Sequence, residues 1–173
     1  MYNHFGSLDN SSILNAIRYM AVTEKCDFIL IDHISIAVSG IESNNERKLI
    51  DILMTRLRQL CEELGVGLIC ICHLKRGDGK KSAEEGGSIS LEDLRGSQAI
   101  AQLSDTIIAL ERNQQADSDV KKNLVQIRVL KCRQTGDTGI GGKLWFNKEK
   151  NRLEIPDADL MNDIESDNEV PEF

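Results

Sequence analysis

Two polar residues directly follow apolar segments of this sequence, and each is a candidate for chemistry. Asp32 comes after the apolar run 28–31, and His73 comes after the apolar run 66–72. Both runs have the composition of buried strands, and ligands in open α/β sheets bind at the carboxyl ends of strands. An aspartate there has the form of a Walker B site, which holds Mg²⁺ beside nucleotide phosphates, usually through water. The structural alternatives are a turn or helix-capping role for Asp32 and a hydrogen-bonded strand-end role for His73.

A pair of cations ends another strand-like segment, 124–131. Lys131 and Arg133 are separated by one residue and precede a Thr-Gly turn. On a strand, such residues point to the same face, so the two charges would project together. That geometry suits contact with a phosphate, whether of a nucleotide or of DNA. The alternative is a solvated edge strand whose charges oppose aggregation.

A phosphate-binding loop does not accompany these candidates. The P-loop pattern G-x-x-x-x-G-K-[ST] is approached only around Gly79-Lys80. There, Leu74 occupies the position of the first glycine and Lys81 occupies that of the hydroxyl residue. A G-x-G-x-x-G pattern is also missing. The sequence therefore contains parts of a nucleotide site without its phosphate cradle.

The first half of the chain alternates helical and strand-like patterns that would position Asp32 and His73. Asp9 is a candidate N-cap for a helix to about residue 25, and the strand 28–31 follows. After a loop over 33–44, leucines at helical spacing predict a long helix that ends at Gly65. The strand 66–72 comes next.

The second half begins with a Gly-rich, polar loop over 75–93, a length typical of functional loops. A short helix over 97–102 and strands over 106–110, 124–131 and 143–146 follow it. The alternation predicts an α/β fold with a mainly parallel sheet flanked by helices.

Composition indicates one folded domain over 1–155 and a disordered acidic tail over 156–173. The chain has 173 residues, of which 40% are apolar, and a net charge of −7. The tail holds seven of the 28 acids and no Lys or Arg, which leaves 21 acids against 21 bases in the folded part. A neutral body can still bind DNA where its bases cluster. No apolar run is long enough to span a bilayer, and residues 1–10 lack the pattern of a signal peptide.

The five cysteines are odd in number and contain no C-x-x-C pair, so they indicate reduced, mostly buried thiols in an intracellular protein. Cys70, Cys72 and His73 alternate along one apolar segment. Because no second ligand pair exists, a zinc site is not expected there.

Six motifs combine into a family resemblance. In order, they are Ile-Asp-His-Ile-Ser-Ile (31–36), Cys-His-Leu-Lys-Arg (72–76), Asp-Leu-Arg-Gly-Ser (93–97), Ala-Gln-Leu-Ser-Asp (101–105), Ala-Leu-Glu-Arg-Asn-Gln-Gln (109–115) and Lys-Cys-Arg-x-Thr-Gly-Asp (131–137). Together they resemble the C-terminal part of the helicase domain of T-seven-type phage primase-helicases. These are DnaB-like, RecA-fold hexameric motors, and the resemblance runs from His4 to about residue 155.

The resemblance implies roles for the candidate residues. Asp32 would be the Walker B residue that organises Mg²⁺, His73 the phosphate sensor, and Gln102 a residue that transmits the nucleotide state. The loop after His73 would line the channel that binds single-stranded DNA. Its contact residues would be Lys75, Lys80, Lys81, Arg95, Gly96 and Ser97.

Further roles fall on the second half. Arg133, with Lys131 beside it, matches the arginine finger that enters a neighbouring subunit's site. Arg112 and Phe146 match the pair that packs around the nucleotide base, and Phe146 replaces the usual tyrosine. The acidic tail ending in Phe173 resembles the segment that docks on the replicative DNA polymerase; the alternative is a tail that only promotes solubility.

The family's P-loop and catalytic glutamate are missing, so the RecA-like core would lack its N-terminal P-loop strand and helix. We expect the chain alone to be inactive and to act in a homo-hexamer or with a complementing P-loop half, using Mg²⁺ with ATP or dTTP in the cytoplasm of an infected bacterium. Two alternatives remain: a non-catalytic module that binds single-stranded DNA and polymerase, and a RecA-like recombination ATPase.

Overall fold

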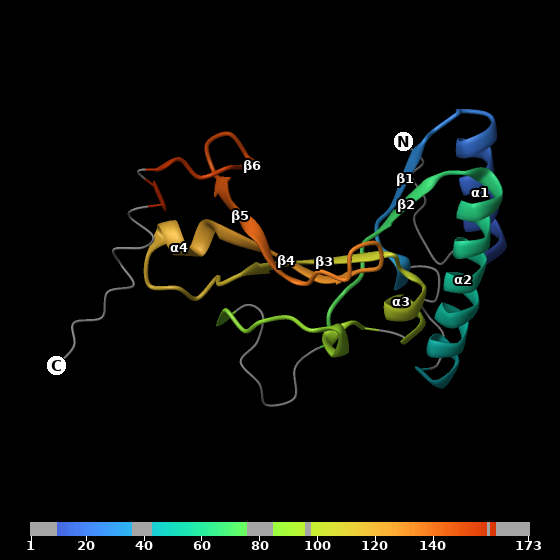
Figure 1. Cartoon of the computed structure of the whole chain (residues 1–173), viewed down its shortest axis with the longest axis horizontal. Helices are drawn as coiled ribbons and strands as arrows, with labels where there is room; N and C mark the ends of the chain where they lie inside the picture. The colour runs from blue at the N-terminus through green and yellow to red at the C-terminus, as the bar shows by residue number, and fades with distance from the viewer. Residues whose placement is uncertain (1–9, 36–42, 76–84, 96–97, 159, 162–173) are drawn as a thin grey trace. The chain divides into compact units, whose positions relative to one another are not determined.

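The computed structural model describes residues 10–35, 43–75, 85–95, 98–158 and 160–161 (Figure 1). The chain divides into two compact units. The first comprises 1–75 and 92–104, and the second comprises 76–91 and 105–173. None of the described helices is both long and apolar enough to cross a membrane.

The first unit holds a parallel pair of strands and the helices beside it (Figure 1). Its elements are α1 (Asn10–Val22), β1 (Phe28–Ile31), α2 (Ser43–Leu64), β2 (Gly67–Cys70) and α3 (Gln98–Leu103), with the short helix η3 (Leu91–Asp93) before α3. β1 and β2 pair from Phe28 opposite Gly67 to Ile31 opposite Cys70. Parallel neighbours need a long crossover connection, and α2 supplies it.

The core of this unit lies between the helices and one face of the strands. Ile17 of α1 and Leu53 and Leu60 of α2 are 2%, 1% and 2% exposed, because the helical period brings each apolar stripe onto its neighbour. As predicted, α2 ends at Gly65, whose φ of +67° suits glycine and whose N–H donates to the Cys61 carbonyl at 2.9 Å.

The other face of the strands is open, which corrects the expectation of a strand buried on both faces. Ile29 is 4% exposed, whereas Phe28 and Leu30 are 73% and 61% exposed. The continuous apolar run predicted burial of both faces. Alternate side chains of a strand point to opposite faces, however, and only one face packs against helices here.

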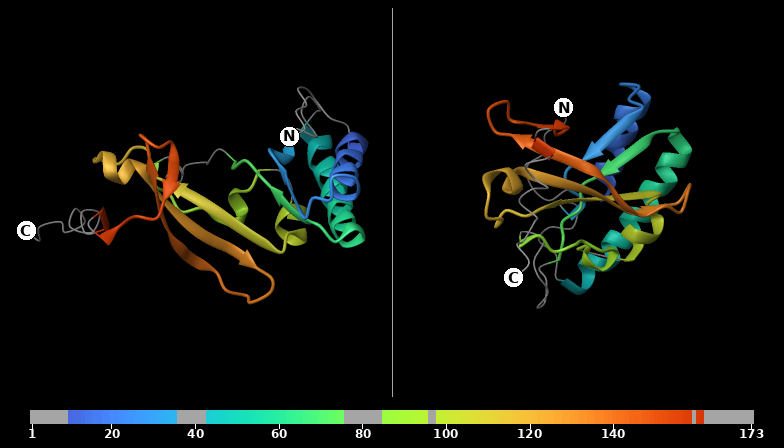
Figure 2. Two further views of the ribbon diagram at one scale, coloured as in Figure 1. Left: turned by 90° about the horizontal axis from the view of Figure 1, so that it is seen from above. Right: turned by 60° about the vertical axis from the view of Figure 1, so that its left-hand side comes forward.

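The second unit is an antiparallel sheet (Figure 2). Its strands are β3 (Thr106–Arg112), β4 (Leu124–Cys132), β5 (Gly139–Asn147) and β6 (Arg152–Glu154), paired in the order β3-β4-β5-β6, and α4 (Asp119–Asn123) lies between β3 and β4 in sequence. The α/β class is confirmed, but the sheet is less parallel than expected. Among the described strands only β1 and β2 pair in parallel, since the connections after β3 are too short for a crossover.

The start of the acidic tail is more ordered than the composition predicts. Asp157 caps a turn in which Leu160 N–H donates to its carboxylate at 2.9 Å and Met161 N–H donates to its carbonyl at 3.0 Å. Aspartate is a favoured residue for such caps, so this turn does not need buried apolar groups. The tail residues 162–173, including Phe173, lie outside the described residues.

Candidate functional site

Asp32 and His73 emerge at the same end of the parallel pair. Beyond β1 and β2, Ile71 N–H donates to the Ile31 carbonyl at 2.9 Å, and Ile34 N–H donates to the Ile71 carbonyl at 3.0 Å. The peptide bond from Asp32 to the next residue is cis. The Asp32 side chain is exposed at this strand end, as a residue that meets a ligand must be.

His33 is part of this cluster, although the sequence reasoning did not single it out. Its ring centroid lies 4.0 Å from that of His73, with the ring planes tilted by 41°. Its Nδ1 is 2.7 Å from the Ser35 hydroxyl oxygen, so one of the two atoms donates to the other. The position directly after Asp32 was the available signal. Two imidazoles and a carboxylate therefore gather where nucleotide phosphates bind in open α/β sheets.

The residues suit a magnesium ion held mainly by phosphates better than a metal caged by protein. In the described part of the chain, no group of three or more His, Cys, Asp or Glu side chains could hold a metal ion. Mg²⁺ in nucleotide sites commonly keeps several waters and takes one or two carboxylates, and Asp32 can contact such a water. The Cys70 thiol is a poor metal ligand, since burial, followed by the nearby Cys61 and Cys72 thiols, raises its pKa to about 11.

The ends of the predicted DNA loop are tied together directly after His73. Arg95 N–H donates to the His73 carbonyl at 2.8 Å, and Lys75 N–H donates to the Asp93 carbonyl at 2.7 Å. The Lys75 ammonium donates to the Glu92 carbonyl at 2.8 Å, so this predicted DNA contact also closes the base of the loop. A shift of the chain at His73 therefore reaches both ends of the loop.

The remaining predicted loop contacts, Lys80, Lys81, Gly96 and Ser97, lie outside the described residues. Gln102 is exposed on α3, in the same unit as Asp32 and His73.

In the second unit, Arg133 forms an ion pair with Asp105, with Nη1 3.1 Å from Oδ1. The Arg133 N–H also donates to the Asp105 carbonyl at 2.8 Å. β4 ends at Cys132, so Arg133 belongs to the following turn, whereas Lys131 is in the strand. The described strand thus includes only Lys131 of the two, and the shared face of the two cations stays a prediction.

Arg112 and Phe146, the predicted base-binding pair, lie together. The centre of the Arg112 guanidinium is 5.5 Å from the Phe146 ring centroid, within the range of a cation–π contact. Arg112 Nε donates to the Lys122 carbonyl at 2.6 Å, and Nη2 donates to Asn123 Oδ1 at 2.8 Å. Asn123 was missed by the sequence reasoning, because a five-residue polar helix leaves little periodic signal.

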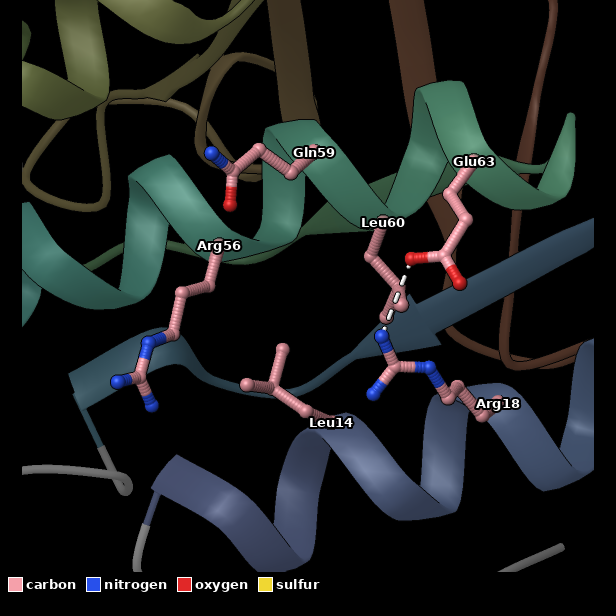
Figure 3. A pocket seen from close by; sticks show the side chains of 6 residues that line it. All are labelled: Leu14, Arg18, Arg56, Gln59, Leu60 and Glu63. Atoms are coloured by element: carbon pink, nitrogen blue, oxygen red, sulfur yellow. Dashed lines mark hydrogen bonds and ion pairs between the residues drawn. The ribbon is translucent and has the colours of Figure 1, made fainter.

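A hollow of about 280 Å³ lies between α1 and α2 (Figure 3). Its lining is Leu14, Arg18, Arg56, Gln59, Leu60 and Glu63. Arg18 and Glu63 form an ion pair at 3.1 Å across it. None of the predicted site residues lines this hollow, and it lies on helices rather than at strand ends, so we do not place the chemistry there.

Comparison with known proteins decides the family. The family described as "DnaB-like helicase C terminal domain" matches residues 3–154. The chain belongs to this family.

The relatives agree with this assignment. The chain is 51% identical over 154 residues to the DNA helicase/primase of Enterobacteria phage T3, covering 89% of this chain and 27% of that protein. It is 30% identical over 107 residues to a probable plasmid replicative DNA helicase of Chlamydia trachomatis, covering 61% of this chain and 23% of that protein. The chain thus spans about a quarter of the length of these relatives.

Solved structures confirm the RecA-like fold. The ATPase domain of G40P matches with a TM-score of 0.70 and 23% identity, covering 90% of this chain and 54% of that chain. A DnaB-like replicative helicase, solved in a study of its interactions with primase, matches with a TM-score of 0.66 and 22% identity, covering 90% of this chain and 36% of that chain. The predicted resemblance to DnaB-like helicases is therefore confirmed.

Proposed function

We propose that this chain is part of a ring-shaped, NTP-dependent replicative DNA helicase that translocates on single-stranded DNA and unwinds duplex at the fork. It would supply the Walker B aspartate, the phosphate sensor, the DNA loop and the arginine finger. The observation that carries the proposal is the cluster of Asp32, His33 and His73 at the strand ends, followed immediately by the hydrogen-bonded base of the loop.

Asp32 would orient the attacking water and hold, through water, the Mg²⁺ that accompanies ATP or dTTP. When bound, that ion supplies positive charge to the phosphates as the γ-phosphoryl group is transferred. The exposed carboxylate at the end of β1 fits this role, because it can reach a water beside the phosphates without being one of several direct ligands.

His73 would report the state of the γ-phosphate to DNA. Its ring packs on His33 and its carbonyl accepts the Arg95 N–H, so a change at the ring shifts the backbone that closes the loop. Lys75, Lys80, Lys81, Arg95, Gly96 and Ser97 would contact DNA phosphates without reading sequence. Gln102 would transmit the same nucleotide state from α3.

The second unit would contribute to two sites. Arg112 and Phe146 would stack on the nucleotide base. Arg133, assisted by Lys131, would enter the neighbouring subunit's site and stabilise charge that develops during phosphoryl transfer. The neighbours would be copies of the same subunit in a hexamer, and the protein would act in the cytoplasm of a bacterium infected by a phage. The acidic tail, ending in Phe173, would dock on the replicative DNA polymerase.

These 173 residues contain neither a P-loop pattern nor the family's catalytic glutamate. We therefore propose that they hydrolyse NTP only together with a segment that supplies the P-loop half. DNA-stimulated hydrolysis of ATP and dTTP by the chain, with and without a protein supplying that half, tests this dependence. Activity only in the complemented mixture supports the proposal, whereas equal activity of the chain alone contradicts it.

Point variants identify the site within the complemented mixture. Asp32→Asn is expected to lower hydrolysis about 10- to 100-fold, the usual loss when a residue that orients metal-bound water is changed. Asp117→Asn changes an exposed aspartate outside the cluster and serves as the matched control. If Asp32→Asn and Arg133→Ala both keep full activity while the mixture still binds single-stranded DNA, the chain is a non-catalytic binding module.

A further inference from the structure

Side-chain contacts hold both ends of the short helix α4. The Ser118 hydroxyl oxygen caps its first turn by accepting the Lys121 N–H at 3.3 Å. Its last residue, Asn123, is 3% exposed, which is unusual for an amide side chain on a helix of five residues. A buried amide requires partners, and both of its polar atoms have them.

Asn123 joins the helix to Arg112. Its Nδ2 donates to the Asp119 carbonyl at 2.8 Å, and its Oδ1 accepts from Arg112 Nη2 at 2.8 Å. Because one end of the amide is fixed by α4, the other end presents its oxygen in a set direction. The Lys122 carbonyl accepts a hydrogen bond from Arg112 Nε at 2.6 Å. It is one of the carbonyls that have no partner within the helix at its C-terminal end.

The two acceptors fix the plane of the guanidinium. Arg112 is thereby held against Phe146, with the guanidinium centre 5.5 Å from the ring centroid. Nε and one N–H of Nη2 are thereby committed to Lys122 and Asn123, which holds the guanidinium in a set orientation. A nucleotide base can stack on a guanidinium or on an aromatic ring, since every base has a π-face.

We propose that Asn123 is a positioning residue for nucleotide binding, which sets Arg112 in the orientation that meets the base. This inference rests on the proposed base-binding role of Arg112 and Phe146. It adds a residue outside that pair. Pre-organisation of a long, flexible arginine lowers the entropy lost when the nucleotide binds.

The test measures kcat and KM for ATP and dTTP in the helicase complemented with its P-loop half. Asn123→Leu, which keeps the volume and removes the acceptor, is expected to raise both KM values about tenfold and to leave kcat at saturation unchanged. Asn123→Asp keeps an oxygen facing the guanidinium but loses the donor to the Asp119 carbonyl, so it is expected to raise KM less than Asn123→Leu does. Asn113→Leu is the control, because that amide accepts the Gln115 N–H instead.

Inorganic triphosphate, used as a competitive inhibitor, separates base positioning from a general loss of structure. It has no base, so Asn123→Leu should leave its inhibition constant unchanged; an equal weakening for triphosphate and NTP overturns the inference.

Arg112→Ala distinguishes the inference from the function on which it rests. If Arg112→Ala leaves KM unchanged, Arg112 and Phe146 are not a base-binding pair, and the proposed function is wrong on this point. If Arg112→Ala raises KM but Asn123→Leu does not, the base-binding role of Arg112 stands and the positioning role of Asn123 is overturned.

Discussion

At the scale of single residues, the ion pair between Arg133 and Asp105 has the properties of an exchangeable contact. The two side chains are 48% and 38% exposed. Ion pairs this exposed contribute about 0–1 kcal/mol to stability, so a phosphate from a neighbouring subunit can replace Asp105 at small cost. The Arg133 N–H remains bonded to the Asp105 carbonyl, which keeps the turn in place while the side chain moves.

Asp105→Asn is therefore expected to leave the free energy of unfolding within about 1 kcal/mol of the original value, because only a half-exposed pair is lost. Arg133→Ala is expected to cost little stability as well, yet to lower NTP hydrolysis in the complemented ring by about 10³-fold or more. Urea denaturation and hydrolysis rates measure the two effects. A large loss of stability in both variants would make Arg133 a structural residue.

The sequence could predict the position of a residue where a local pattern marks it, but not where only tertiary contact does. Asp32 and His73 follow apolar runs, and the structure places both at the ends of the parallel pair. The contacts of His33 and Glu111 include residues distant in sequence, and Asn123 belongs to a helix too short to show a periodic pattern. Periodicity does not register such contacts.

At the scale of elements, Glu111 joins β3, β4 and the later part of the loop 75–93. It is 8% exposed and accepts from Arg128 Nε, Gln126 Nε2 and the Ile89 N–H, each at 2.7 Å. Burial raises the pKa of this carboxyl, but the hydrogen bonds from these three groups outweigh burial, so its pKa is lowered overall. The charged form of Glu111 thus stabilises the folded sheet.

Glu111→Gln is expected to lower the free energy of unfolding by about 2–3 kcal/mol near neutral pH, since it removes the negative charge that the Arg128 guanidinium faces in this buried contact. Because the folded-state pKa lies below the usual 4.5, this contribution is complete above that value and is lost as the pH falls through the folded-state pKa. Denaturation at several pH values measures the effect. The exposed Glu149→Gln is the control, and an equal, pH-independent loss in both variants would contradict the role of Glu111.

Element prediction was strongest for long periodic segments and weakest for pairing direction. The end of α2 at Gly65 follows from the leucine spacing and the glycine. Strands β3–β6 are antiparallel because short connections bring the chain back beside the strand before. An apolar pattern alone does not reveal this direction. The sequence pattern also gave no signal for α4 and β6, which have five and three residues.

At the scale of the whole molecule, the chain matches part of a longer helicase/primase, and the activity that we propose for it depends on neighbours. It spans 27% of the phage T3 DNA helicase/primase that it resembles. Asp32 belongs to one compact unit and Arg133 to the other. In a ring with head-to-tail contacts, each boundary would combine Asp32 of one subunit with Arg133 of the next.

Mixed rings test this central claim most directly. Rings that also contain the P-loop half are assembled from two kinds of subunit, one carrying Arg133→Ala and the other Asp32→Asn. We expect either kind alone to have little DNA-stimulated NTP hydrolysis. The equimolar mixture should regain activity, because random mixing completes about a quarter of the boundaries with an intact Asp32 and an intact Arg133. If the mixture stays as inactive as the separate rings, although unsubstituted subunits assembled in the same way are active, the two residues do not act across a subunit boundary.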